Sequence, residues 1–276
     1  MTGTTTPERA TTRVADAMHA PRPAASDAAV DDARALSLNL VLGALPPAEY
    51  AHLRTHLEPC VVTAGTLLAD AARPLRHAYF PETGLLSGLR RMQDGTCIEA
   101  YAVGRDGLLG IPQLLGETCS STCVAVGAVT GVCWRVALPT LRALLPELPM
   151  LAAMLPRMLV ALLDQVQQVL ACNTLHTVEQ RCARRLLMTH DRVGDEFEQT
   201  HHMLAQLLAV RRAGVTVAAG AFQKAGLITY HRGRIRIVDR AGLEAAACEC
   251  YPVMRAPAID LSGVYEWTDG RAHTHN

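Results

Sequence analysis

The stretch that decides the fold is THHMLAQLLAVRRAGVTVAAGAFQKAGLITYHRGRIRIVDR, residues 200–240. Its leucines recur at helical spacing directly after Thr200, a residue type that caps helix N-termini, so a first helix is predicted there. A short turn at residues 209–210 leads into a second helix over residues 211–225, and Gly226 suits its end.

Two β-prone runs follow these helices. They are residues 227–230 and 235–238, and a turn containing Gly233 joins them. Helix, turn, helix and hairpin, in this order, make a winged helix-turn-helix, whose second helix enters the major groove of DNA. The stretch therefore predicts duplex DNA as a partner.

The arginines of this stretch lie where such a domain contacts DNA. Arg211 and Arg212 open the second helix, where an arginine fork can bond bidentately to a guanine or clasp a phosphate. We expect both to contact bases and phosphates. Arg232 and Arg234 lie in the hairpin and are expected to contact the DNA backbone, and strand alternation places Arg236 on the same face as Arg234.

Charge is segregated along the chain, although the formal net charge is +0. Residues 172–240 carry eleven Lys or Arg against six Asp or Glu, a net of +5. Residues 1–171 carry thirteen against fifteen, and residues 241–276 carry two against five. One basic module is therefore combined with acidic flanks, as nucleic-acid binding requires.

The rest of the chain predicts an α+β protein with a separate β domain. Residues 36–137 contain short β-prone runs punctuated by Gly, Pro and Asp, which is typical of a roll or barrel. These runs are residues 60–62, 77–80, 97–103, 123–129 and 132–136, and a helix over residues 45–57 precedes them. We expect residues 174–250 to form the winged helix domain.

A long helix over residues 138–173 is predicted to join the two domains. Its seam has coiled-coil spacing and is formed by Leu148, Leu151, Leu155, Met158, Leu162, Gln165, Val169 and Cys172. Pro149 and Pro156 indicate a kink or break in its first part. Either a homodimer uses this seam, or the helix packs on its own domain, and the sequence favours neither.

The remaining composition excludes several classes of protein. No uncharged apolar run reaches the ~18 residues of a membrane span, and no secretory signal is visible, so a cytoplasmic location away from membranes is expected. Residues 1–35 have a disordered composition, and residues 251–276 form a tail without a readable period. Nucleophile-elbow, phosphate-loop and zinc-protease motifs are absent, so we do not expect an enzyme.

Further motifs carry a family resemblance. They are YFPETGLLSGLRRMQDGTCIEAYAVGRDGLLG (residues 79–110), HTVEQRCARRLLMTHDR (176–192) and ACECY (247–251). With the stretch quoted first, they resemble the Crp–Fnr superfamily of bacterial transcription regulators over about residues 38–251. The resemblance implies a cyclic-nucleotide-binding-like β-roll that senses an effector, a dimerising helix and a DNA-binding winged helix. It also implies a second copy of the chain and RNA polymerase as partners.

The resemblance implies roles for residues of the DNA-binding domain. Arg212 matches the arginine that reads a guanine in this family, and Thr216 is a further polar candidate on the same helix. Val217 stands where a polar reader is common, so it would contact a thymine methyl instead. Thr200 and His201 begin the preceding helix and are expected to bind a phosphate through backbone N–H groups.

The effector pocket departs from the family pattern. Gly110 and Thr122 match residues of the cyclic-nucleotide site, but Ile111 replaces its glutamate and Ser121 replaces its arginine. Because burying a phosphate without a cation is costly, we expect no cyclic AMP or GMP and no other cofactor. We assign Gly110, Ser121 and Thr122 to a degenerate effector pocket.

The nine cysteines show no disulfide framework and are expected to be reduced. None precedes Cys60, which argues against the iron–sulfur cluster of some family members. The pairs Cys172–His176 and Cys248–Cys250 each supply two ligands at most, whereas a structural metal site needs four, so no metal site is expected.

The sequence thus predicts a homodimeric DNA-binding transcription regulator that reads a palindromic operator. Two alternatives stay open. One is a regulatory module in which the β-roll and the winged helix dock a protein partner. The other is a regulator with a redox switch, for which the loop thiols Cys119 and Cys123 are the best candidates.

Overall fold

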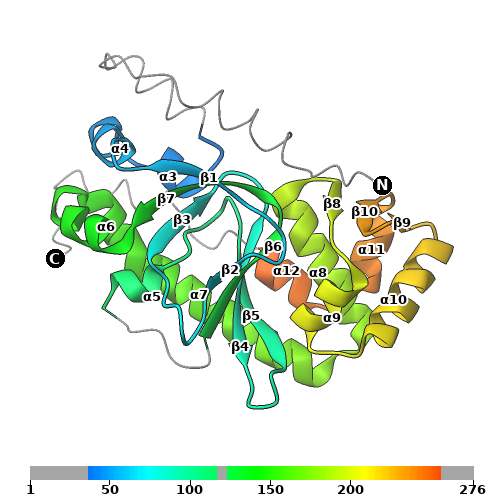
Figure 1. Ribbon diagram of the computed structural model, residues 1–276. Coiled ribbons are helices and arrows are strands. Elements are labelled where there is room, and N and C mark those ends of the chain that lie inside the picture. The colour runs from blue at the N-terminus through cyan, green and yellow to red at the C-terminus, as the bar shows by residue number, and fades with distance from the viewer. Residues whose placement is uncertain (1–36, 117–122, 256–276) are drawn as a thin grey trace, which may run out of the picture.

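A computed structural model describes residues 37–116 and 123–255. It has an N-terminal β-roll, a long helix that runs past the roll, and a C-terminal helical domain with a small sheet (Figure 1). The α+β fold predicted from the sequence is confirmed. The predictions for residues 1–35 and for Cys119, Ser121 and Thr122 lie outside the described residues, as does most of the predicted tail.

Antiparallel strands form the β-roll as two sheets. One sheet has the order β1-β7-β3 and the other the order β2-β6-β4-β5. The strands are β1 (Glu58–Val62), β2 (Leu67–Ala69), β3 (His77–Pro81), β4 (Leu85–Arg91), β5 (Cys97–Val103), β6 (Cys123–Val129) and β7 (Gly131–Ala137). All five predicted runs form strands, whereas strands β2 and β4 were not predicted from the sequence.

Short helices flank the strands of the β-roll in the sequence. They are α3 (Leu40–Gly43), α4 (Pro47–Arg54) and α5 (Ile111–Leu114). Pro47 occupies the first turn of α4, where its missing N–H costs nothing. The predicted helix over residues 45–57 is therefore shorter than expected at both ends.

The predicted single helix over residues 138–173 is wrong in its first part. The chain instead forms α6 (Leu138–Leu144), the 3-10 turn η1 (Leu145–Glu147) and then α7 (Pro149–Leu175). Pro149 starts α7 at a position where proline is favoured, and Pro156 lies inside α7 without ending it. The break predicted from the prolines thus occurs at Pro149 only.

The face of α7 that carries the predicted seam packs on its own chain. Leu148, Leu151, Leu155 and Met158 are buried in the core of the β-roll. Val169 and Cys172 are buried farther along. Of the two interpretations of the seam, a dimer contact or packing on the same domain, the structure therefore has the second. Among the described residues α7 alone is long and apolar enough to cross a membrane, a test that core helices also pass.

The C-terminal domain begins with α8 (Val178–Val193), whose N-terminus carries a capping box of Thr177 and Gln180. Its other elements are β8 (Glu196–Glu198), α9 (His201–Leu208), α10 (Arg212–Lys224), β9 (Ile228–His231), β10 (Arg234–Ile237), α11 (Arg240–Ala246) and α12 (Cys250–Arg255). The two helices, the turn and the hairpin predicted from the sequence are present. Helix α12 replaces the start of the predicted tail.

The two parts of the chain share a hydrophobic core. Leu85, Leu89 and Val124 of the second sheet pack in one cluster with Leu186 and Leu187 of α8. A buried ion pair accompanies them, in which Arg185 Nε lies 2.7 Å from Glu99 Oε2. The C-terminal domain is therefore held on the second sheet by apolar contact and by charge (Figure 1).

Candidate nucleic-acid interface

Helix α10 has one buried face and one exposed face. Val215, Ala218, Ala219 and Phe222 pack into the core of the domain. The exposed face carries Arg212, Ala213, Thr216, Val217 and Gly220. Most of these side chains are small, so the backbone of α10 can approach a groove of DNA closely.

Arg211 and Arg212 stand at the N-terminus of this helix. Arg211 is the N-cap residue but makes no side-chain capping bond, and both arginines are exposed. Within residues 37–116 and 123–255 neither guanidinium has an ion-pair partner. Both side chains are therefore available for the base and phosphate contacts expected of them.

Thr216 and His201 contact each other and not only solvent. The Thr216 hydroxyl donates to the carbonyl of Arg212 at 3.0 Å, and His201 Nδ1 lies 3.1 Å from the same hydroxyl oxygen. The ring of His201 stacks on Tyr230 at 4.1 Å between centroids. Burial lowers the pKa of His201, and the charge of Arg212 lowers it further. A neutral His201 thus joins α9, α10 and the wing as a positioning residue.

Thr200 is the N-cap of α9, as predicted. Its side chain accepts a hydrogen bond from the backbone N–H of Met203 at 3.1 Å. Because the hydroxyl is used for the cap, a phosphate at this helix end would bind to backbone N–H groups, with help from the helix dipole.

The wing is the hairpin of β9 and β10. Arg232 (φ 48) and Gly233 (φ 84) form its tight turn in the left-handed region. Arg234 and Arg236 share the exposed face of β10, as strand alternation predicted. Arg234, however, lies 3.2 Å from Glu196 and 3.0 Å from Glu198 of the neighbouring strand β8.

These two carboxylates change the expected role of Arg234. The hydrogen bond that Arg234 donates to Glu198, together with the charges of both glutamates, raises the pKa of the guanidinium. A phosphate contact would have to displace them. Arg232 and Arg236 have no ion-pair partner among the described residues, so they are the better candidates for contacts to the DNA backbone.

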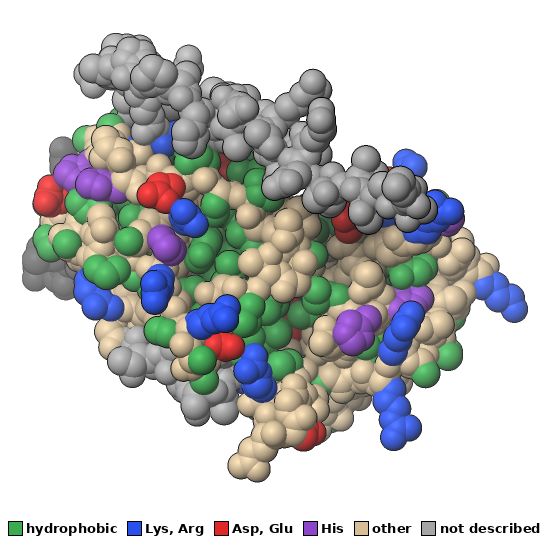
Figure 2. Space-filling view, viewed as in Figure 1, with side chains coloured by type: hydrophobic (Ala, Val, Ile, Leu, Met, Phe, Trp, Pro, Cys, Tyr) green, Lys and Arg blue, Asp and Glu red, His purple; other side chains and the backbone are tan. Residues whose placement is uncertain are grey.

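The basic surface is narrower than the count of charges in the sequence implied. Of the eleven basic residues in residues 172–240, Arg181, Arg184 and Arg185 are buried. Figure 2 shows Lys and Arg side chains projecting from the end of the molecule that α10 and the wing form. The positive surface thus coincides with the helix that would read DNA.

Comparisons with known proteins also identify a helix-turn-helix domain in this part of the chain. Residues 180–246 match the family model of the Crp-like helix-turn-helix domain. The structure is similar to that of a Crp/Fnr-family regulator from Eubacterium rectale, with a TM-score of 0.57 and 19% identity over 75% of this chain and 96% of that one. No curated protein matches the chain.

Other solved structures share the fold. FixK2 from Bradyrhizobium japonicum has a TM-score of 0.58 and 15% identity, over 70% of this chain and 98% of that one. TTHB099, a CRP-family regulator from Thermus thermophilus, has a TM-score of 0.56 and 22% identity, over 68% and 96%. Residues 180–246 thus match the Crp-like helix-turn-helix family, and the chain has the fold of Crp/Fnr-family regulators. The family prediction is confirmed.

The effector region of this Crp–Fnr fold is described only in part. Gly110 is the N-cap of α5 with φ +116, where a Cβ would lie 3.4 Å from the backbone of Ala78. Ile111, which stands where the family has its glutamate, is 3% exposed and packs in the core. This position is therefore built for apolar packing.

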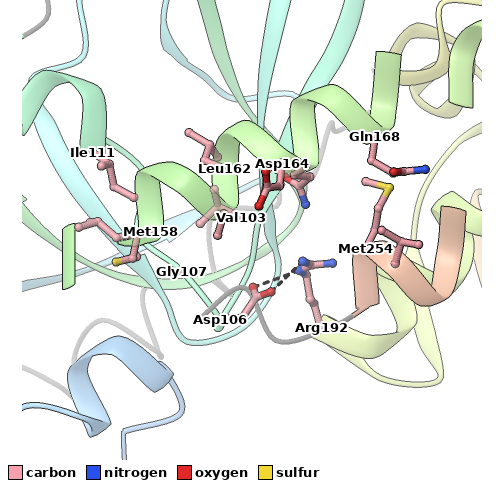
Figure 3. A pocket seen from close by; sticks show the side chains of 14 residues that line it. Val103, Asp106, Gly107, Ile111, Met158, Leu162, Asp164, Gln168, Arg192 and Met254 are labelled. Atoms are coloured by element: carbon pink, nitrogen blue, oxygen red, sulfur yellow. Dashed lines mark hydrogen bonds and ion pairs between the residues drawn. The ribbon is translucent and has the colours of Figure 1, made fainter. Parts of the chain in front are cut away.

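A cavity of about 200 Å³ lies where the β-roll, α7 and α12 meet (Figure 3). Its lining includes Val103, Leu108, Met158, Leu162 and Met254, and is thus largely apolar.

Charged groups of both signs also line this cavity. The guanidinium of Arg192 is paired with Asp106 at 2.7 Å, and the carboxylate of Asp164 lies on the opposite wall. Arg192 is the only cation that the described residues contribute to the lining, and it is already neutralised.

Seven cysteines whose side chains the structure describes have free thiols. They are Cys60, Cys97, Cys133, Cys172, Cys182, Cys248 and Cys250. Burial raises the pKa of Cys133 and that of Cys182 to about 12, so neither is a reactive thiolate. The structure also brings together the two ligand pairs that the sequence left apart, Cys172–His176 and Cys248–Cys250. The spacing of each pair was visible in the sequence, but not their contact.

Proposed function

We propose that this protein is a homodimeric transcription regulator that reads a palindromic operator through α10. The observation that carries the proposal is the exposed face of α10, which begins with two arginines free of ion pairs to the described residues and continues with small side chains. Arg212 would read a guanine edge, and Val217, which is 65% exposed, would contact a thymine methyl.

An apolar stripe on α7 supports the dimer. Leu159, Val160, Leu163 and Leu170 are exposed on the side of the helix that faces away from the β-roll core. Leu163 and Leu170 are seven residues apart, the repeat of a coiled-coil seam. Two such helices related by a two-fold axis would bury these leucines and present two copies of α10 to successive turns of the major groove.

The dimer is tested by Leu163→Arg, with Leu67→Arg as the matched control. Leu67 is 40% exposed on β2, far from α7 in the sequence and on another element. We expect Leu163→Arg to be a folded monomer in sedimentation equilibrium, whereas Leu67→Arg stays a dimer. A wild-type chain that sediments as a monomer at micromolar concentration would refute the dimer.

The operator is tested by selection of random duplex DNA with the purified chain. We expect an enriched palindrome with half-sites about one helical turn apart. Arg212→Ala should lose about 1–3 kcal/mol and relax the preference at one base pair of each half-site. Arg236→Ala is the control, because it should weaken binding to all sequences alike. Equal losses on selected and random DNA for Arg212→Ala would refute base reading.

A cyclic nucleotide is not expected to regulate this protein. A phosphate in the cavity would meet Asp106 and Asp164, and the one cation that the described residues place in the lining is paired. We therefore expect cyclic AMP and GMP to change neither the melting temperature nor operator affinity, as measured by thermal shift and anisotropy. A contact with RNA polymerase and a redox role of Cys119 and Cys123 stay predictions. Selection without any enriched sequence would favour the protein-docking alternative.

A further inference from the structure

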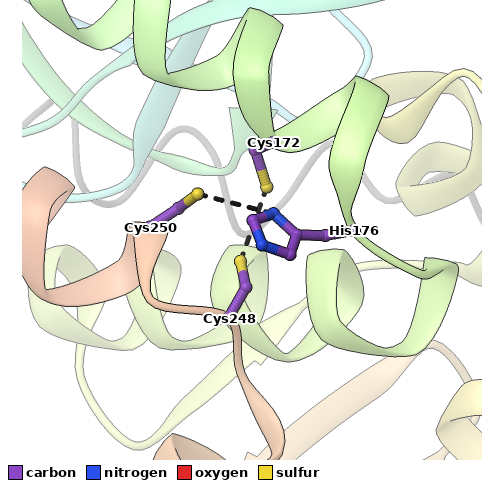
Figure 4. Close-up of side chains that lie close together, drawn as sticks. All are labelled: Cys172, His176, Cys248 and Cys250. Carbon is purple, nitrogen blue, oxygen red and sulfur yellow. Dashed lines mark hydrogen bonds between the residues drawn. The ribbon is translucent and has the colours of Figure 1, made fainter.

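Four metal-ligating side chains meet beside the junction of the long helix and the DNA-binding domain (Figure 4). They come from three separate segments: the last turn of α7, the linker before α8, and the turn that enters α12. We call them the Cys3His cluster, which consists of Cys172, His176, Cys248 and Cys250. Their ligand atoms all lie within 4.8 Å of one another.

The distances inside the cluster match those around one tetrahedral ion. Zn²⁺ binds sulfur at about 2.3 Å and nitrogen at about 2.0–2.1 Å, which places two sulfurs about 3.8 Å apart and a sulfur and a nitrogen about 3.5 Å apart. Here Cys172 Sγ and Cys248 Sγ are 3.5 Å apart, and Cys250 Sγ and His176 Nδ1 are 3.6 Å apart. The sulfurs are too far apart for a disulfide bond.

We propose that the Cys3His cluster binds one Zn²⁺ ion as a closed structural site. Three thiolates and one imidazole complete a tetrahedron and leave no open position for substrate, as in structural zinc sites. An iron–sulfur cluster does not fit, because its ligands bind different iron atoms and are held apart by the cluster itself. The three cysteines are at most 3% exposed, so the ion would be shielded from solvent.

The groups around the cluster orient its ligands as in other metal sites. His176 Nε2 lies 3.0 Å from the carboxylate of Glu249, which leaves Nδ1 facing Cys250. A carboxylate that holds the far nitrogen of a ligand histidine fixes the ring and raises its basicity. Gln168 donates a hydrogen bond from Nε2 to Cys250 Sγ at 3.0 Å, which stabilises a thiolate there.

Two buried arginines supply an independent argument. Arg181 and Arg184 are 8% and 3% exposed, and the Nε of each has no hydrogen-bond partner among the described residues. Both interact electrostatically with Cys172. Three thiolates, one Zn²⁺ and a neutral histidine carry one net negative charge, which would offset the cost of burying these cations.

The site would clamp the DNA-binding domain to the long helix. Cys172 belongs to α7, His176 to the two-residue linker between α7 and α8, and Cys250 to α12, which packs on both helices. One ion would thus fix three elements on both sides of the linker. Binding at sites of this kind is coupled to folding, because the unfolded chain does not hold the four ligands together. The proposal does not depend on the dimer or on the operator.

The test uses the untagged full chain, purified under a phosphine reductant, with metal content measured by mass spectrometry. We expect about one Zn²⁺ per chain and, after exchange, the intense visible absorption of tetrahedral Co²⁺ bound to thiolates. Cys250→Ser and His176→Gln should lose most of the metal. Cys60→Ser, at a thiol of β1 outside the cluster, should retain it.

Metal removal from the wild-type chain covers the case in which a variant fails to fold. A chelator should lower the melting temperature, and one equivalent of Zn²⁺ should restore it, with no effect of Mg²⁺. A wild-type chain that carries less than ~0.2 metal ions and binds no Co²⁺ would overturn the proposal. So would metal content that Cys250→Ser leaves unchanged.

Discussion

The buried ion pair between the two parts of the chain allows a quantitative prediction. Arg185 of α8 bonds Glu99 of β5 through Nε at 2.7 Å and through Nη2 at 3.0 Å. The side chains are 1% and 9% exposed. Ser87 and Thr189 complete the network by donating to Glu99 and accepting from Arg185, respectively. Water therefore cannot replace either partner.

Removing one partner leaves the other charge buried and uncompensated. Arg185→Met and Glu99→Met should each lower the free energy of unfolding by about 3–5 kcal/mol, a large part of the ~5–15 kcal/mol of a typical domain. The double variant should lose much less than the sum, because no charge is left without a partner. A surface pair would contribute only about 0–1 kcal/mol.

The assay is urea unfolding of the chain at a fixed protein concentration and a fixed pH. Fixed concentration matters because a dimer would add a term that depends on it. The reasoning is refuted if each single variant costs less than about 1 kcal/mol, or if the two costs add in the double variant.

Two further predictions concern the DNA-binding face. Replacing Glu196 and Glu198 by Gln should free the Arg234 guanidinium from its two ion pairs. Affinity for any duplex should then rise, and the salt dependence of binding should steepen by about one counterion. Anisotropy titrations at several salt concentrations measure this salt dependence, and an unchanged slope of log affinity against log salt would contradict the prediction. Because burial and Arg212 lower the pKa of His201 below 6.5, the unfolded chain takes up its proton first, and stability should fall as pH drops below about 6.5. His201→Gln should remove this part of the pH dependence in thermal melts, whereas an identical pH profile would rule out His201 as its source.

Local signals explain why the winged helix could be predicted from the sequence. Thr200 caps α9 through its own side chain, and the left-handed turn that ends α10 falls on Gly226. The tight turn of the wing likewise uses Gly233. Each of these features depends on a few neighbouring residues. Strand β4 was missed because its centre is Gly88, a residue that weakens a strand pattern. Only the fold shows why glycine is needed there: a Cβ would lie 2.1 Å from the ring of Tyr101.

The face of α7 could not be predicted for a different reason. Apolar residues at 3-4 spacing indicate a buried stripe, but not which partner covers it. The stripe containing Leu151 and Leu155 is covered by the β-roll of the same chain. The stripe containing Leu163 and Leu170 was hidden in the same apolar run, because α7 is hydrophobic on more than one side. A helix that packs on its own domain and, as we propose, on a second copy would carry both stripes, and periodicity alone cannot separate them.

The arginines of α8 show that the basic residues of the sequence have two different roles, contact with DNA and contact inside the molecule. They count toward the basic module, yet each is directed into the molecule at a different place. Arg181 donates to the carbonyl of Leu208 at the end of α9, Arg185 holds Glu99 of β5, and Arg192 holds Asp106 in the wall of the cavity. Helix α8 is thus bonded to the DNA-binding helices on one side and to the β-roll on the other. A change at the cavity that displaces Asp106 must move α8 or break its ion pair. Movement of α8 would alter the support of α9 and α10. The inward-directed arginines of α8 would thus couple the β-roll to the DNA-binding face, while the arginines of α10 and the wing would contact DNA itself.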